Sequence, residues 1–253
     1  MLLMSGNASA PDLSSRRVVV AGGTGSVGEG IVRGYLDAGA DVIVPTRTQA
    51  RADAFRQVIG GSAERLRLVI GDYTTLESAR ALAERIEAEH GPVTDAAASI
   101  GGWWQGPPLT GTSRSAWDEY FTGYATAHLA VAQAFVPRIG PEGAYHIIVG
   151  ASGLFPVPGS GIVSMQQAAL LMMGRVLQAE NDGRRRVFTH VLGVVNNRNR
   201  PQQRAEWISA TDVGELAASI SGNPQITSTG FQLLDQSAFQ QALNGVRAGG
   251  TRS

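Results

Sequence analysis

Short apolar runs alternate with longer amphipathic stretches along most of the chain. The runs are rich in valine, isoleucine and alanine and are bounded by glycine or polar residues, which is typical of buried parallel strands. They predict strands over 17–21, 41–44, 66–70, 96–100, 145–149, 187–195 and 231–234. Stretches with apolar residues at helical spacing lie between the runs and predict helices near 31–36, 51–58, 74–90, 115–136 and 163–180.

The alternation of strand and helix predicts how the chain is arranged. Right-handed crossovers place helices on both faces of one sheet, so we expect an α/β fold, a doubly wound parallel sheet of about seven strands in three α/β/α layers. The third helix carries its own boundary signals, since Thr74 and Glu77 fit a capping box and Gly91 and Pro92 end the helix. Ligands of such sheets bind beyond the carboxyl ends of the strands. The segments that follow the strands should therefore surround one site.

Neither a repeat nor a Pro/Gly-rich linker interrupts the pattern, so residues 16–253 are expected to form a single domain. Residues 1–15 are expected to be a flexible leader, because their apolar start is short and lacks the basic residues of a signal peptide. No apolar stretch approaches the roughly 20 residues of a transmembrane helix. We therefore expect a cytoplasmic protein with no membrane partner.

Composition narrows the chemistry further. The chain carries 21 basic and 21 acidic residues, so its net charge gives no general attraction to nucleic acid. The absence of cysteine excludes disulfides, thiol nucleophiles and thiolate metal sites. The histidines are scattered without metal-ligand spacing, so no metal site is expected. They are His90, His128, His146 and His190.

A glycine-rich turn follows the first predicted strand and opens a helix. Gly22, Gly25 and Gly28 are spaced three apart in this turn. Such glycines allow a tight turn, a close approach of backbone to a pyrophosphate, and close packing of helix on strand. The helix N-terminus then offers free N–H groups to the phosphates. The position of the turn predicts a Rossmann-type, dinucleotide-binding domain with an adjoining substrate pocket.

The end of the second strand bears on which dinucleotide is bound. Sites selective for NAD usually place Asp or Glu there to hold the ribose 2′-hydroxyl. The chain has Arg47 instead, which can pair with a 2′-phosphate or simply be a solvated residue at the start of the next helix. NADP(H) is therefore favoured over NAD(H).

With these motifs, the sequence resembles the short-chain dehydrogenase/reductase family across roughly residues 17–235. The glycine turn matches the family's glycine motif, Asp72 stands where the family contacts adenine, and Trp117 stands where a Trp often begins a long helix. The resemblance implies a nicotinamide dinucleotide in the cleft and a small-molecule substrate beside it. The cofactor-binding residues that it and the turn imply are Gly22, Thr24, Gly25, Ser26, Val27, Gly28, Arg47, Asp72, Tyr73, Ser99, Ile100, Gly101, Gln167 and Asn197.

The family's catalytic residues are largely missing from the chain. The helix after the fifth strand aligns without gaps to the family's Tyr-x-x-x-Lys helix, with Val163 at the Tyr position and Gln167 at the Lys position. No Tyr or Lys occurs anywhere in 154–174. Tyr124 stands at the position of the family's helix Asn, and Ser152 remains near its usual serine. General acid assistance of about 10²–10⁴ in rate would be lost with the Tyr.

Ser152 and Tyr124 are the remaining catalytic candidates. Ser152 can donate to a carbonyl oxygen, or it can be a turn serine that bonds its own backbone. Tyr124 can replace the missing acid, or it can be a packing aromatic that faces the sheet. The substrate-binding candidates, which include two tryptophans that can equally pack under their loop, are Trp103, Trp104, Ser152 and Val163.

These features predict an atypical NADP(H)-dependent oxidoreductase that reduces an activated carbonyl, enone, quinone or iminium substrate, since these acceptors need little protonation. The alternative is a redox-inactive protein of the same fold, either a cofactor-bound partner subunit, a dinucleotide sensor or a non-redox enzyme. Helices 115–136 and 163–180 resemble the dimerisation helices of the family, so a homodimer or homotetramer is expected through them.

Overall fold

The computed structural model describes residues 11–181 and 184–249. Its main sheet has seven parallel strands in the order β3-β2-β1-β4-β5-β6-β9. In chain order these strands are β1 (Arg17–Ala21), β2 (Asp41–Thr46), β3 (Leu66–Ile70), β4 (Asp95–Ala98), β5 (Ala144–Gly150), β6 (Arg186–Leu192) and β9 (Thr229–Leu233). The strand order reverses between β1 and β4, which is the switch point where such sheets bind ligands.

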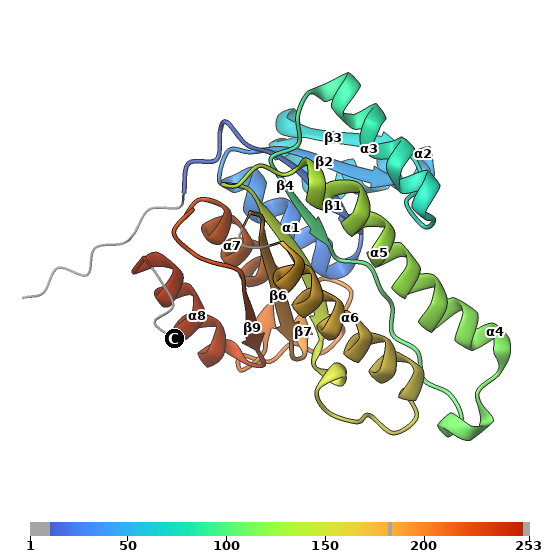
Figure 1. Ribbon diagram of the computed structural model, residues 1–253. Helices are drawn as coiled ribbons and strands as arrows, with labels where there is room; N and C mark the ends of the chain where they lie inside the picture. The colour runs from blue at the N-terminus through green and yellow to red at the C-terminus, as the bar shows by residue number, and fades with distance from the viewer. Residues whose placement is uncertain (1–10, 182–183, 250–253) are drawn as a thin grey trace, which may run out of the picture.

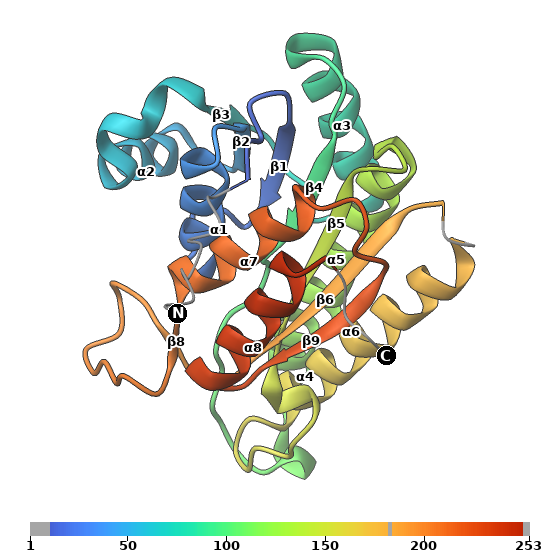
Figure 2. The same ribbon diagram turned by 90° about the vertical axis from the view of Figure 1, so that its left-hand side faces the viewer.

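Helices cover both faces of the sheet (Figures 1 and 2). One face carries α1 (Ser26–Asp37), α2 (Gln49–Ile59), α7 (Ala210–Ser221) and α8 (Gln236–Arg247), and the other carries α3 (Leu76–His90), α5 (Tyr124–Phe135) and α6 (Gly161–Glu180). Strand β1 shows why two apolar layers form, because Val18 and Val20 pack into one and Val19 and Ala21 into the other. A strand buried on both faces reads as a continuous apolar run. The predicted three-layer α/β/α fold is confirmed.

Several expected element boundaries differ from the structure, of which three bear on the site. The fourth strand ends at Ala98 and the sixth at Leu192, after which the chain forms the short strands β7 (Val195–Asn196) and β8 (Ile208–Ser209), which pair with each other. The capping box of α3 uses Thr75 and Ser78 rather than Thr74 and Glu77. Thr74 instead donates its hydroxyl to Asp72 at 2.7 Å, which leaves Thr75 to cap the helix.

The long helix expected over 115–136 is interrupted. A short α4 (Arg114–Trp117) is followed by a π-helical turn over Asp118–Gly123, and only then by α5. Single π-helical turns inside helices occur frequently at functional sites. Tyr120 lies within this turn and Tyr124 directly follows it, with ring centroids 5.9 Å apart. The interruption therefore falls where the helix faces the candidate site.

The backbones of helices α1 and α7 approach each other closely where glycines lie between them. A Cβ on Gly30 would overlap the backbone of Ala210, and a Cβ on Gly34 or Gly214 would overlap the backbone of the opposite helix. Helix α7 was not predicted, although Ser209 and Asp212 form its capping box and supply the sequence signal for one. Helix α8 was not predicted either. Among the described helices, none is long and apolar enough to cross a membrane.

Most of the expected leader, residues 1–10, lies outside the described residues. Its last part is not loose, because the side chain of Leu13 is buried in the core and its N–H donates to the carbonyl of Ala38 at 2.7 Å. The expectation of a flexible segment extending to residue 15 is therefore wrong at its end.

Candidate functional site

The turn between β1 and α1 is built by glycines that no larger residue can replace. Gly22 has a φ of +79°, and a Cβ there would overlap the carbonyl group of Ser99 at the end of β4. A Cβ on Gly28 would overlap the backbone of Gly22. Gly25 is different, since its φ is −80° and its Cβ would meet only the carbonyl oxygen of Gly22, at 3.1 Å. Gly22 and Gly28 therefore shape the turn, while Gly25 leaves backbone exposed beside it.

The N-terminus of α1 opens toward this exposed backbone. Gly25 is the N-cap residue and supplies no side-chain cap, so the first N–H groups of α1 point out of the turn without a side-chain acceptor. Free N–H groups and the positive end of the helix dipole favour an anion. We call the turn Gly22–Gly28 the phosphate cradle. It has no side chain at its glycines and lies at an uncapped helix N-terminus, and both features fit the pyrophosphate of a dinucleotide.

Residues after β2 and β3 border the same turn. Burial raises the pKa of Tyr73, and the backbone of Gly22 and the charge of Arg47 act to lower it, which places the Tyr73 side chain beside the turn. Arg47 is exposed and directly precedes Thr48, the N-cap of α2. Asp72 accepts hydrogen bonds from Thr74 and from the Ser78 hydroxyl, at 2.7 and 3.2 Å. Its carboxylate therefore also supports the start of α3.

A segment between β7 and β8 crosses over the turn, and we call residues 197–207 the lid. Arg198 pairs with Glu29 of α1 at 2.5 Å, and the Asn199 amide donates to the Ser26 hydroxyl at 2.8 Å. Glu29 is buried, whereas Arg198 is about half exposed. Asn197 accepts from the Asn199 N–H at 3.0 Å and thereby shapes the lid itself. The lid is thus fastened to the first turn of α1.

The segment after β4 is held from below by a histidine. His128 of α5 lies with its Nε2 2.8 Å from the carbonyl oxygen of Ile100. Burial lowers the pKa of His128 to about 4, so the ring is neutral at pH 7. Ser99 donates its N–H to Ala21 at 2.9 Å, which continues the pairing of β1 and β4. Gly101 has open space around its Cα on the side where a Cβ would be.

Tyr124 reaches the same segment from α5. Its hydroxyl lies 2.6 Å from the position that a Cβ would take on Gly102, so the ring extends toward the site. Burial raises its pKa, Tyr120 and Glu119 raise it further, and Arg47 opposes them. A raised pKa moves a tyrosine away from the range in which general acids work best near neutrality. The hydroxyl remains a hydrogen-bond donor.

The start of α6 faces the end of β5. Gln167 accepts the N–H of Gly150 at 2.6 Å and donates to the Oε1 of Gln166 at 2.7 Å. Each end of the Gln167 amide is therefore already engaged within the protein, and its second N–H and second oxygen lone pair are what it can offer a ribose. Val163 is buried one turn earlier. Ser152 lies in the 3₁₀ turn Ala151–Gly153, half-buried, with its Oγ 3.6 Å from the Cβ position of Gly150.

The loops after β4 and β5 are joined to each other. Gly106 donates its N–H to the carbonyl of Gly159, and the Ser160 hydroxyl donates to the carbonyl of Trp104, both at 2.8 Å. The Trp104 ring is half-buried, 6.0 Å from that of Tyr120, whereas Trp103 is exposed. Only one of the two tryptophans therefore packs beneath its loop.

Comparison with known proteins gives the family. The family model for short chain dehydrogenases matches residues 16–206. The chain belongs to the short-chain dehydrogenase family. An uncharacterised oxidoreductase of Mycobacterium tuberculosis is 27% identical over 125 residues, which are 49% of this chain and 47% of that protein. The matched region thus spans about half the length of this relative.

Solved structures of the family have the same fold. A short-chain dehydrogenase of Shigella flexneri 2a, solved with NADP, has a TM-score of 0.77 at 19% identity and covers 88% of this chain and 99% of its own. An NADPH-bound short-chain oxidoreductase of Pseudomonas aeruginosa PAO1, described as containing an atypical catalytic centre, has a TM-score of 0.75 at 20% identity. That match covers 88% of this chain and 96% of the other.

Short-chain dehydrogenases carry a catalytic lysine on the helix that corresponds to α6, and this chain has no lysine on α6 or on any other element. All 21 basic residues of the chain other than histidine are arginines, so no lysine from any other element can replace the family's ammonium group. Arginine stays protonated at any physiological pH and does not act as a proton donor. The family's lysine therefore has no counterpart in this chain.

Two contacts at the site were not expected from the sequence. Glu29 pairs with Arg198 of the lid, and His128 fixes the segment after β4. Glu29 and Arg198 lie 169 positions apart, and no sequence motif joins them. The location of His128 four residues after Tyr124, on a helix that had to face the sheet, was the one usable signal.

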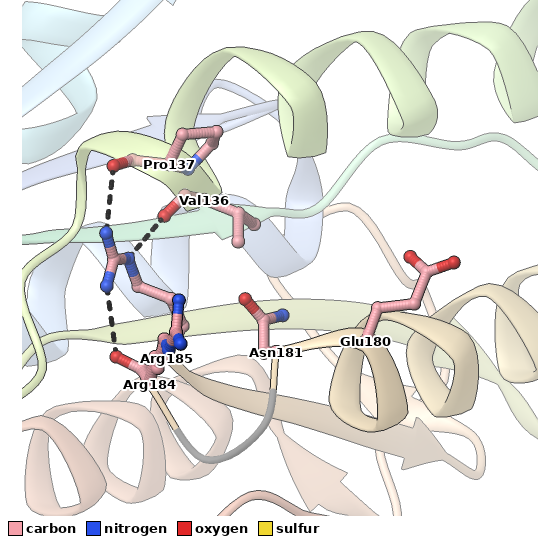
Figure 3. Close-up of a pocket in the computed structure, with 6 residues that line it drawn as sticks. All are labelled: Val136, Pro137, Glu180, Asn181, Arg184 and Arg185. Carbon is pink, nitrogen blue, oxygen red and sulfur yellow. Dashed lines mark hydrogen bonds between the residues drawn. The ribbon is translucent and has the colours of Figure 1, made fainter.

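A separate hollow lies away from this site. It has a volume of about 250 Å³ and is lined by the ends of α5 and α6 and the chain before β6, including Val136, Glu180 and Arg185 (Figure 3). The guanidinium of Arg185 is held by the carbonyls of Val136 and Pro137. This hollow lies at the amino ends of β5 and β6, at the edge of the sheet opposite the glycine turn.

Proposed function

We propose that the protein is an NADP(H)-dependent oxidoreductase that reduces an activated carbonyl, enone, quinone or iminium substrate without a tyrosine acid. The observation that carries this proposal is the pairing of an intact phosphate cradle at Gly22–Gly28 with Val163 and Gln167 at the positions of the family's acid pair. The first feature supports a bound dinucleotide. The second restricts the chemistry that can take place beside it.

The residues around the cradle support the choice of cofactor. Arg47 follows β2 where no acid is present to hold a 2′-hydroxyl, and it is exposed and close enough to act on the pKa of Tyr73 and Tyr124. A guanidinium in this position can pair with a 2′-phosphate. A nicotinamide, when bound, supplies the hydride, and the lid lies beside the first turn of α1.

The chain has no strong general acid to protonate the oxygen of a carbonyl substrate. Ser152 and Tyr124 can each donate a hydrogen bond to a developing oxyanion, which lowers the barrier without a complete proton transfer. Arg47 acts on Tyr124 through its charge, but burial outweighs it and the pKa of Tyr124 stays raised. No hydrogen bond among the described residues joins either hydroxyl to a cation as the lysine does in the family. We therefore infer that the substrates are acceptors that can take up a hydride before a proton arrives. Quinones and enones are such acceptors, because the anion formed from them is delocalised.

The test is the loss of NADPH absorbance with purified protein against quinones, enones, iminium ions and simple ketones, repeated with NADH. We expect turnover of the activated acceptors with NADPH, far slower turnover of simple ketones, and weaker use of NADH. A Gly25→Asp variant should lose activity, because a carboxylate would then occupy the phosphate cradle. Arg47→Gln should narrow the preference for NADPH over NADH.

Tight NADPH binding without turnover of any acceptor would contradict this proposal. It would favour a redox-inactive protein. The buried, hydrogen-bonded amides of Gln166 and Gln167 agree with that alternative, because an amide cannot supply a proton at neutral pH. Binding measured in the same cuvette by NADPH fluorescence separates this outcome from a protein that holds no dinucleotide at all.

A further inference from the structure

Exposed apolar side chains gather at the carboxyl ends of three neighbouring strands. Trp103 follows β4 and is 64% exposed, and Phe155 follows β5 and is 56% exposed. Leu109, Leu154 and Val194 are also exposed and come from the segments after β4, β5 and β6. Single exposed apolar residues are ordinary on a protein surface, but a group of them at the rim of a binding site marks a ligand-binding surface.

The same segments carry no charge. No Asp, Glu, Lys or Arg occurs between Asp95 and Arg114, and none occurs between Glu142 and Arg175. The single histidine in these stretches, His146, is buried and neutral, because burial holds its pKa well below the usual range. The two loops that border the substrate side of the cleft are therefore uncharged along their whole length.

The two loops form one wall rather than two independent flaps. The Gly106–Gly159 and Ser160–Trp104 hydrogen bonds hold them together, and Leu109 lies against Gly161, with its Cδ1 3.1 Å from the Cβ position of that glycine. Figures 1 and 2 both show the loop after β4 and the loop after β5 side by side at one end of the molecule. Trp103 and Phe155 thus come from two loops that are hydrogen-bonded to each other.

The positive charges of the lid lie on the other side of the cleft and are already engaged. Arg47 follows β2, and the proposed function assigns it to the 2′-phosphate of the cofactor. Arg198 pairs with Glu29, and Arg200 and Arg204 lie over the Trp207 ring, 5.5 and 5.1 Å from its centroid. These arginines belong to the lid over the phosphate cradle. An anionic substrate would therefore find no counter-charge along the wall formed by the loops after β4 and β5.

We infer that the substrate is a neutral, flat, apolar molecule that binds against Trp103 and Phe155. This inference rests on the proposed function for the place of the substrate, and it adds the class of molecule. Aromatic faces recognise flat rings by stacking and by burying apolar area. A carboxylate or sulfonate in the same place would lose its hydration without gaining a partner.

The probes for the test are 1,4-naphthoquinone and its 2-sulfonate, which share one ring system and differ in charge. Binding is measured by titration calorimetry, to the protein alone and to the protein loaded with NADP⁺, so that no turnover is needed. Quinone addition to side chains does not interfere, because the chain has neither cysteine nor lysine. We expect the neutral quinone to bind at least tenfold more tightly than the sulfonate. A negative heat-capacity change would mark the burial of apolar surface.

Variants locate the binding. Trp103→Ala and Phe155→Ala should each weaken binding of the neutral quinone at least fivefold, while Leu76→Ala, which removes an exposed apolar side chain at the start of α3, should leave it unchanged. Sulfonate binding as tight as that of the neutral quinone would overturn the inference, and so would equal affinity of all three variants. A change in sedimentation of Trp103→Ala or Phe155→Ala would also overturn it, because the rim would then be a contact between copies of the chain. Absence of NADPH turnover would contradict only the proposed function, since quinone binding is measured without it.

Discussion

The glycines of the first turn have different roles, although they belong to one motif. Gly22 needs its positive φ and the space beside Ser99, so it determines whether the turn forms. Gly25 has an ordinary φ and leaves backbone exposed, so it determines how closely a phosphate can approach. Folding and binding can therefore be separated by substituting one glycine at a time.

We expect Gly25→Ala to unfold at nearly the same temperature as the natural protein but to bind NADPH at least tenfold more weakly. Gly22→Ala should be destabilised, because a left-handed conformation costs an alanine about 1–2 kcal/mol before any clash is counted. Thermal unfolding and NADPH fluorescence titration measure the two effects. Gly140→Ala, with open space at its Cβ, is the neutral control. Unchanged NADPH affinity of Gly25→Ala would mean that no phosphate approaches this turn.

Three buried histidines make stability depend on pH. His146 and His190 lie side by side, with Nδ1 and Nε2 2.9 Å apart, and burial lowers the pKa of His190 and of His128 to about 4. The unfolded chain binds a proton on each near pH 6.5. In the folded chain His128 and His190 do so only near pH 4, and burial also holds the pKa of His146 well below its usual range. Their contribution to stability is therefore complete above pH 6.5 and is lost as the pH falls from 6.5 toward 4.

We expect the free energy of unfolding to be about 2 kcal/mol lower at pH 5 than at pH 7.5 for each histidine with a folded pKa of about 4. We expect His190→Gln, which keeps a polar partner for His146 and does not titrate, to lose correspondingly less over this range. Urea unfolding at several pH values measures the difference. His90→Gln, at the partly exposed end of α3, should follow the natural protein. Parallel curves for His190→Gln and the natural protein would contradict the assignment.

At the scale of elements, the lid depends on a few bonds to α1. The Arg198–Glu29 pair and the Asn199–Ser26 hydrogen bond attach it beside the phosphate cradle. Glu29 is also bound by Arg33 at 3.1 Å, so its carboxylate is held in place from the helix side. Closing segments of this kind often control how fast a ligand leaves.

We expect Arg198→Gln to release NADPH at least fivefold faster, because the lid loses its charged attachment. Stopped-flow displacement of NADPH by excess NADP⁺ measures the rate. Arg204→Gln is the matched control, since it removes the same charge from the same lid without touching Glu29. Because Arg198 is about half exposed, added salt should speed release from the natural protein more than from Arg198→Gln. Equal release rates for the two variants would show that the pair does not hold the lid.

The elements differ in how far the sequence could predict them. Strands β1 and β5 were predicted to within a residue because a continuous valine and isoleucine run has few other uses. The π-helical turn at Asp118–Gly123 was not, since its residues are compatible with an ordinary helix and only tertiary packing selects it. At the site, the glycine turn follows from local geometry, whereas the Glu29–Arg198 pair joins distant segments and depends on the finished fold. Local chemistry was therefore predictable and the fastening of the lid was not.

At the scale of the whole molecule, one surface helix is unusually apolar. Met165, Met172 and Val176 are exposed on α6 at spacings of seven and four, which puts them on one helix face. Leu129 of α5 is exposed as well. The prediction of a homodimer or homotetramer through helices 115–136 and 163–180 gives this face a partner.

We expect sedimentation velocity to show an oligomer and Met172→Glu to dissociate it, because two like charges would meet where apolar side chains pack. Gln241→Glu, which adds the same charge to the exposed side of α8, should leave the assembly unchanged. A monomer for the natural protein at micromolar concentration would contradict the prediction.

The glycine contact between α1 and α7 has a consequence for how such a protein can change over generations. Gly30, Gly34 and Gly214 tolerate no side chain, and α7 begins directly after β8. The C-terminal end of the lid, next to β8, is therefore held by α7 against α1, the helix that begins at the phosphate cradle. Insertions, deletions or whole exchanges of sequence between 197 and 207 leave that anchor intact. A homologue can therefore carry a different lid sequence, and bind different ligands, while the α1–α7 contact stays the same.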